Sequence, residues 1–152
     1  MNTQPQSLYN KDFNAWALGE AKKLKLKQFD AVDWVNLIEE IEDMSKRERK
    51  SLKSRLITLM MHLLKWQVQS ENQCNSWRAT IEAQRLEINK LLQEMPSLKN
   101  DLPVEIQNEN NYKIALLKAV QETNLNKNKF PNEMPYSQAQ LLDDEFYPDI
   151  LS

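Results

Sequence analysis

Gly19 is the only glycine in this chain of 152 residues, and this limits the folds and sites that the chain can form. Phosphate-binding loops and the nucleophile elbows of hydrolases depend on glycine, because a residue without a Cβ adopts positive φ freely and lets the backbone approach a ligand closely. Tight two-residue hairpins need glycine for the same reason. The sequence therefore disfavours a glycine-rich nucleotide site, a GxSxG hydrolase and a β-protein built on tight hairpins.

Apolar residues recur at helical spacing along the whole chain, and no stretch shows the period-2 alternation of a half-buried strand. Three of the stripes are Tyr9, Phe13, Trp16, Ala17, Ala21 and Leu24; then Trp34, Leu37, Ile38, Ile41 and Met44; then Leu52, Leu56, Leu59, Leu63 and Trp66. The third stripe is widened by further apolar neighbours, which is typical of a central helix. We predict an all-α fold, a single-domain bundle of five or six helices with no β-sheet.

Capping residues predict where these helices begin. The expected N-caps are Asp33, then Asn75 or Ser76, then Asp101 with Pro103, and Ser137 with Gln140 at the third helical position. Ser45 to Glu48 reads as a capping box, so either a new helix starts at Ser45 or one long helix bends there. Residues 1–7 are expected to be a flexible N-terminus, and residues 124–136 a proline-containing linker to a short C-terminal helix.

Composition excludes several other classes of protein. The length suits one domain, and a net charge of −2 with a pI near 5.5 gives no global preference for nucleic acid or anionic membranes. Cys74 is the only cysteine, so neither an intrachain disulfide nor a thiolate metal cage is expected. The N-terminal residues do not resemble a secretory signal, and no apolar run has the length of a membrane span. We expect a cytoplasmic protein without a cofactor and without a membrane partner.

Several separated blocks resemble one known family. They are YNKDFNAW, FDAVDWVNLIEEIEDM, MHLLKW, SWRATIEAQR and FPNEMPYSQAQLLDDEFYP, which together cover nearly the whole chain. In this order they resemble the bacterial, largely cyanobacterial, family called domain of unknown function twenty-nine. The resemblance implies a compact helical fold and implies no activity. The family often has Gly at the position of Ser45 and Glu at the position of Asn36.

A carboxylate–histidine group is the first candidate site. Glu39 and Asp43 are four residues apart, so they share a helix face, and His62 lies in the next helical segment. Two carboxylates and a histidine resemble half of a di-metal site in a helical bundle. The chain has no second acidic helix with a Glu-x-x-His motif to complete such a site. The favoured interpretation of His62 is a core histidine held by a hydrogen bond, or a half-buried histidine paired with an acid.

A run of basic residues is the second candidate. Six bases stand against Glu48 alone between positions 46 and 55, namely Lys46, Arg47, Arg49, Lys50, Lys53 and Arg55. Phosphate contacts need such a cluster. However, acids placed four residues before Lys46 and Arg47 favour pairs along the helix, and no known nucleic-acid-binding motif surrounds the run. A solvated face with salt bridges is the favoured interpretation, and nucleic-acid binding is the alternative.

An aromatic cluster with arginines is the third candidate. Trp66 ends the predicted central helix, and Trp77 begins the next one, followed by Arg78 and Arg85. Such a cluster could bind a ligand, but a corner of the hydrophobic core is the favoured interpretation.

The sequence favours a non-enzymatic, soluble helical protein that acts through a macromolecular partner, most simply another protein. The alternative is an RNA- or DNA-binding protein that uses the basic face of residues 46–55. A metal-dependent hydrolase built on Glu39, Asp43 and His62 is the third hypothesis. The sequence is also compatible with a homo-oligomer.

Overall fold

A computed structural model describes residues 7–151 and contains seven α-helices and no strand within that range. Five of these helices are longer than five residues, since α1 has four residues and α7 has five. The predicted all-α fold without a β-sheet is therefore confirmed. No helix among the described residues is long and apolar enough to cross a membrane.

The chain divides into two compact units, residues 1–46 and residues 47–152. The prediction of a single domain stays a prediction. The flexible segment expected at residues 1–7 lies outside the described residues except for Ser7, which precedes the first helix.

The N-terminal unit contains two helices where the sequence predicted one. These are α1 (Leu8–Lys11) and α2 (Phe13–Lys25), and a short 3₁₀ turn, η1 (Phe29–Ala31), follows them. Asp12 separates the helices because its side chain accepts a hydrogen bond from the backbone N–H of Ala15 and thereby caps α2. The prediction was wrong here because the apolar stripe continues across this cap.

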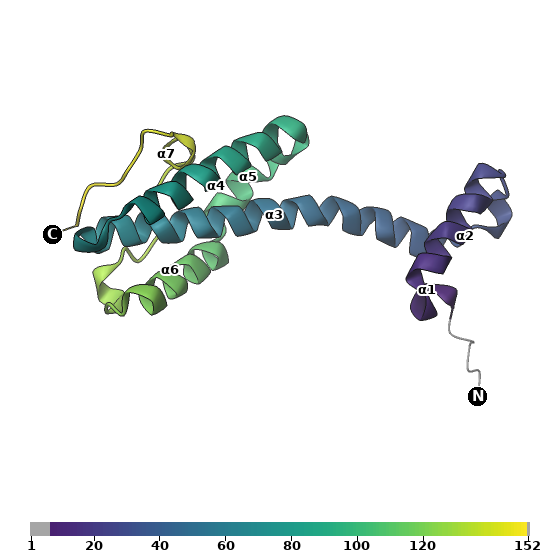
Figure 1. Ribbon diagram of the computed structural model, residues 1–152, viewed down its shortest axis with the longest axis horizontal. Helices are drawn as coiled ribbons and strands as arrows, with labels where there is room; N and C mark the ends of the chain where they lie inside the picture. Colours follow the sequence, from purple (N-terminus) through teal and green to yellow (C-terminus); the bar gives the residue numbers. More distant parts are fainter. Residues whose placement is uncertain (1–6, 152) are drawn as a thin grey trace. The chain divides into compact units, whose positions relative to one another are not determined.

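The third helix, α3 (Trp34–Val68), is continuous through Ser45, and Figure 1 traces it as one unbroken ribbon. Asp33 caps its start as expected, since its Oδ1 accepts from the backbone N–H of Asn36 at 3.4 Å. Ser45 starts no new helix. Its hydroxyl donates to the carbonyl oxygen of Glu42 at 2.7 Å, an alternative to capping that a serine inside a helix commonly uses.

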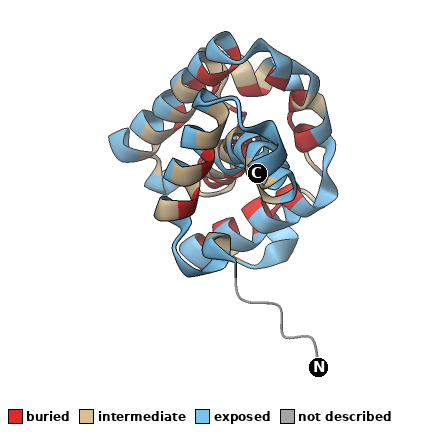
Figure 2. Ribbon diagram, turned by 90° about the vertical axis from the view of Figure 1, so that its right-hand side faces the viewer, coloured by how far each residue is buried: buried red, intermediate tan, exposed pale blue. Residues whose placement is uncertain are grey.

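The C-terminal unit packs four further helices with the second half of α3 around one apolar core. They are α4 (Asn75–Glu94), α5 (Leu102–Gln107), α6 (Glu109–Thr123) and α7 (Gln138–Leu142), with 3₁₀ turns η2 (Ser70–Asn72), η3 (Pro96–Asn100) and η4 (Lys127–Lys129). The predicted central stripe is confirmed, because Leu52, Leu56, Leu59 and Leu63 are fully buried. Buried positions are red in Figure 2.

Helix boundaries in this unit follow local capping chemistry. Cys74 occupies the N-cap position of α4 without a side-chain hydrogen bond, so the expected cap at Asn75 or Ser76 was wrong by one or two residues. Asn108 caps α6 with its own side chain and divides the expected helix after Asp101 into α5 and α6. Ser137 forms the expected capping box of α7. Within the linker of residues 124–136, Phe130 and Tyr136 are buried and belong to the core.

Candidate functional site

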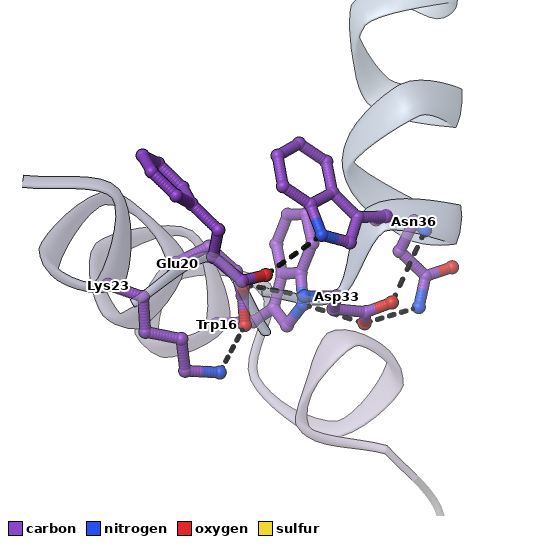
Figure 3. A network of polar contacts seen from close by, with 7 residues as sticks. Trp16, Glu20, Lys23, Asp33 and Asn36 are labelled. Atoms are coloured by element: carbon purple, nitrogen blue, oxygen red, sulfur yellow. Dashed lines mark hydrogen bonds and ion pairs between the residues drawn. The ribbon is translucent and has the colours of Figure 1, made fainter. Parts of the chain in front are cut away.

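A polar network inside the N-terminal unit connects α2 to the start of α3 (Figure 3). Glu20 is buried and accepts two hydrogen bonds, from Lys23 Nζ at 2.8 Å and from the backbone N–H of Asp33 at 2.9 Å. The Asp33 carboxylate in turn accepts from the indole N–H of Trp16 at 3.1 Å and from the side-chain amide of Asn36 at 2.7 Å. The network fixes the start of α3 against α2.

Hydrogen bonding keeps both acids of this network ionised. The bond from Lys23 holds the pKa of Glu20 below its ordinary value, and the bond from the Asn36 amide does the same for the pKa of Asp33. Burial alone would raise the pKa of each acid, so the hydrogen bonds outweigh the effect of burial. Carboxylates with lowered pKa values are poor general acids near neutral pH. The oxygens of both acids accept hydrogen bonds that join α2 to α3, so we interpret the network as structural.

Titration of Asp33 gives a direct check of the network. Because the folded-state pKa is lowered, the stabilisation from Asp33 is complete above its unfolded value of about 4 and is lost as the pH falls through the folded value. We expect the NMR signal of the Trp16 indole N–H to titrate with a midpoint below about pH 3.9. The Asp33→Asn variant should abolish that titration. A midpoint at or above the ordinary value would contradict the network.

An apolar stripe on the first turns of α3 is exposed to solvent. Its members are Trp34, Val35, Ile38, Ile41 and Met44, whose exposed fractions lie between 46% and 78%. Trp34, Ile38 and Ile41 recur at the spacing that places residues on one side of a helix. From the sequence, all of these residues except Val35 were placed in one helical stripe together with Leu37, which is half-buried. Large apolar side chains gathered on a surface mark an interaction site.

Four acids accompany this apolar stripe, and no base lies between Trp34 and Met44. Glu39 and Glu42 are exposed and form no ion pair within residues 7–151. Asp43 contacts Lys46 at 3.7 Å, and Glu40 accepts a hydrogen bond from the Tyr9 hydroxyl. That bond is the main reason why the pKa of Tyr9 rises to about 12. The acids thus form an anionic border beside the apolar stripe.

The candidate carboxylate–histidine group, which was not the favoured interpretation, is not assembled among residues 7–151. In the described part of the chain, no three His, Cys, Asp or Glu side chains come together in a way that could hold a metal, so Glu39, Asp43 and His62 are not brought into one group. His62 lies half-buried on α3, with Nδ1 at 2.9 Å from the carbonyl oxygen of Thr58. Burial lowers the pKa of His62, which therefore stays neutral near pH 7.

The basic run is partly neutralised by neighbouring helices. Arg49 donates to buried Glu105 at 3.0 Å and lies 3.5 Å from Asp101, while Arg55 lies 3.8 Å from Glu87. Lys46 pairs with Asp43, as described above. The remaining three bases, Arg47, Lys50 and Lys53, form no ion pair with any residue between 7 and 151.

Three residues of the candidate aromatic cluster, Trp66, Arg78 and Arg85, meet at Tyr147 in the C-terminal unit, and we did not predict Tyr147. The Arg78 guanidinium lies 4.6 Å from the ring centre of Tyr147 and 5.3 Å from that of Trp66. The Lys65 Nζ lies 4.5 Å from the ring centre of Trp77. Tyr147 belongs to no helix, so no helical spacing marked it.

Arg85 has a structural role in the same cluster. It is fully buried, its Nε donates to the carbonyl oxygen of Leu141 at 2.9 Å, and its Nη2 donates to that of Gln140 at 3.2 Å. These carbonyl groups belong to the last turn of α7, where a cation is favoured. Burial lowers the pKa of Arg85, but an arginine keeps its charge. Arg85 therefore attaches α7 to α4.

A groove of about 730 Å³ lies in the C-terminal unit beside the junction of α5 and α6. Its volume falls in the range of small-molecule sites. The hydroxyl groups of its two tyrosines are engaged within the fold, because Tyr112 donates to the carbonyl oxygen of Pro131 and Tyr136 donates to Gln67 Oε1 at 2.7 Å. Neither phenol can donate its O–H group to a ligand while these bonds persist, and we take the apolar stripe of α3 as the stronger candidate.

Comparison with known proteins gives one match. The family described as Domain of unknown function DUF29 matches residues 8–147. The chain belongs to this family. It matches no curated protein and no solved structure. The DUF29 match contains every candidate residue considered above, including the apolar stripe, the basic run and the aromatic cluster, and it assigns none of them a role.

Proposed function

We propose that this protein is a non-enzymatic binding protein that acts through a macromolecular partner, which it contacts through the apolar stripe of α3. The observation that supports the proposal is the exposure of five large apolar side chains, Trp34, Val35, Ile38, Ile41 and Met44. Fully burying one such side chain contributes about 1.5–3 kcal/mol, so covering several of them would drive a specific association.

The chemistry around the apolar stripe favours a protein as the partner. Glu39, Glu40, Glu42 and Asp43 give this part of α3 a negative field, which repels phosphate groups of nucleic acids and of anionic lipids. We further propose that the protein resides in a bacterial cytoplasm. Cys74 is exposed and free, as cysteines of a reducing compartment commonly are.

Affinity purification from the native host tests this proposal. The tagged full chain should retain a partner, and the Ile38→Asp, Ile41→Asp double variant should retain at least ten times less, because burying two charges costs more than the lost apolar contacts. Leu117→Asp is the matched control, since Leu117 is an exposed leucine on α6. Equal recovery with the double variant would refute the role of the apolar stripe.

Binding of RNA or DNA by the face of residues 46–55 is the second proposed function. It is supported by Arg47, Lys50 and Lys53, which lack an ion pair within the described range. The same purification separates the two proposals. Partners bound through nucleic acid should be lost after nuclease treatment and in the Lys50→Glu, Lys53→Glu variant, whereas partners of the apolar stripe should be retained in both cases.

A further inference from the structure

The N-terminal unit has very few buried side chains. Among residues 7–46 only Trp16, Glu20 and Val32 are buried, and one of these three is an acid. Units near 40 residues rarely bury enough apolar surface to be stable, and they commonly depend on a disulfide, a metal or association with another chain. The exposed apolar stripe of α3 adds to this deficit, because its side chains contribute nothing while they face water.

Two of these three means of stabilisation are missing from this unit. Cys74, the only cysteine, lies outside it, so it holds no disulfide. No group of His, Cys, Asp or Glu suited to a metal occurs in its described residues. Association with another chain is therefore the remaining means of stabilising this unit, and the apolar stripe is a surface through which such an association can occur.

Charges in the N-terminal unit are separated between its two main helices. Lys22 and Lys25 are exposed on α2, whereas Glu39 and Glu42 are exposed on α3. None of these four side chains forms an ion pair within the described residues. The unit thus presents unpaired lysines on α2 and unpaired acids on the start of α3, and a second copy of the same unit offers the complement of both.

We propose that a second copy of this chain covers the apolar stripe. Two N-terminal units pair about a two-fold axis, the stripe of each copy is buried against the other unit, and the lysines of α2 face the acids of the other copy's α3. A two-fold interface uses the same surface on both copies, so that surface must be complementary to itself. An apolar stripe accompanied by both lysines and acids meets this requirement. This inference rests on the proposed function and names the partner of the same surface.

Sedimentation velocity of the purified full chain tests the pairing. We expect a dimer within the range of about 1 to 100 µM, and we expect Ile38→Asp with Ile41→Asp to raise the dissociation constant at least 100-fold. Leu117→Asp should remain dimeric. Far-ultraviolet circular dichroism of each variant shows whether its helices persist. A monomeric wild-type protein at 100 µM, or a folded double variant that stays dimeric, would overturn the proposal.

A charge-exchange experiment tests the predicted contacts. One variant carries Lys22→Glu and Lys25→Glu, and the other carries Glu39→Lys and Glu42→Lys. Each alone should dimerise at least tenfold more weakly than wild type, because like charges then face each other. A mixture of the two variants should form a heterodimer with an affinity close to that of the wild-type dimer, because each α2 then faces an α3 of opposite charge. If the dissociation constant of the heterodimer in the mixture is no lower than that of either variant alone, the proposed pairing of α2 with α3 is wrong.

The two proposals fail in different ways. If the wild-type chain is monomeric but the stripe variant still loses a partner from the host extract, the second copy is refuted and the proposed function stands. If the chain is dimeric through another surface and the stripe variant loses nothing, both proposals are refuted.

Discussion

Leu59→Ala is expected to destabilise the protein by about 2–5 kcal/mol, because it deletes a fully buried side chain and leaves a cavity between packed helices. Leu59 lies on α3 within the hydrophobic core of the C-terminal unit. Urea denaturation followed by circular dichroism measures the change. Leu117→Ala is the matched control, since Leu117 is 68% exposed and its loss should change stability by less than about 0.5 kcal/mol. Equal effects of the two substitutions would contradict the assigned core.

Arg85→Ala is expected to cost about 3–5 kcal/mol. The substitution creates a cavity at a fully buried position and leaves the carbonyl groups of Gln140 and Leu141 without their donor. Amide hydrogen exchange of residues 138–147 should accelerate more than that of α6, because Arg85 holds α7 in place. Arg78→Ala is the control, because exposed Arg78 contributes only ring contacts of up to about 1 kcal/mol. A loss below about 1 kcal/mol for Arg85→Ala would refute this role.

Helical spacing correctly predicted an all-helical chain but missed several helix boundaries, and it could not separate buried from exposed apolar faces. Leu59 and Ile38 belong to stripes of the same period on the same helix, yet Leu59 is fully buried and Ile38 is 51% exposed. Burial depends on which elements pack against a face, and a period of 3.6 residues carries no such information. Helical spacing therefore identified the apolar stripe of α3 but could not indicate that it is exposed.

Local chemistry explains the other differences. Glu20 is buried, which was not predicted, because its second partner, the backbone N–H of Asp33, reaches it only after the chain turns back. Ser45 with Glu48 matches a capping box, but a serine inside a helix also satisfies its hydroxyl group on a preceding carbonyl oxygen. Arg85 was chosen for its place beside the tryptophans, whereas its partners are carbonyl groups 55 and 56 residues further along the chain.

Site-specific photo-cross-linking tests the central claim most directly, namely that a partner covers the apolar stripe of α3. A photoreactive phenylalanine replaces Ile38 in one form of the full chain and Leu117 in another, and both are irradiated in cells of the native host. We expect a discrete adduct from position 38, either with a second copy or with another protein, and none from position 117. Absence of any adduct at position 38, in a chain that is expressed and folded, would contradict the claim.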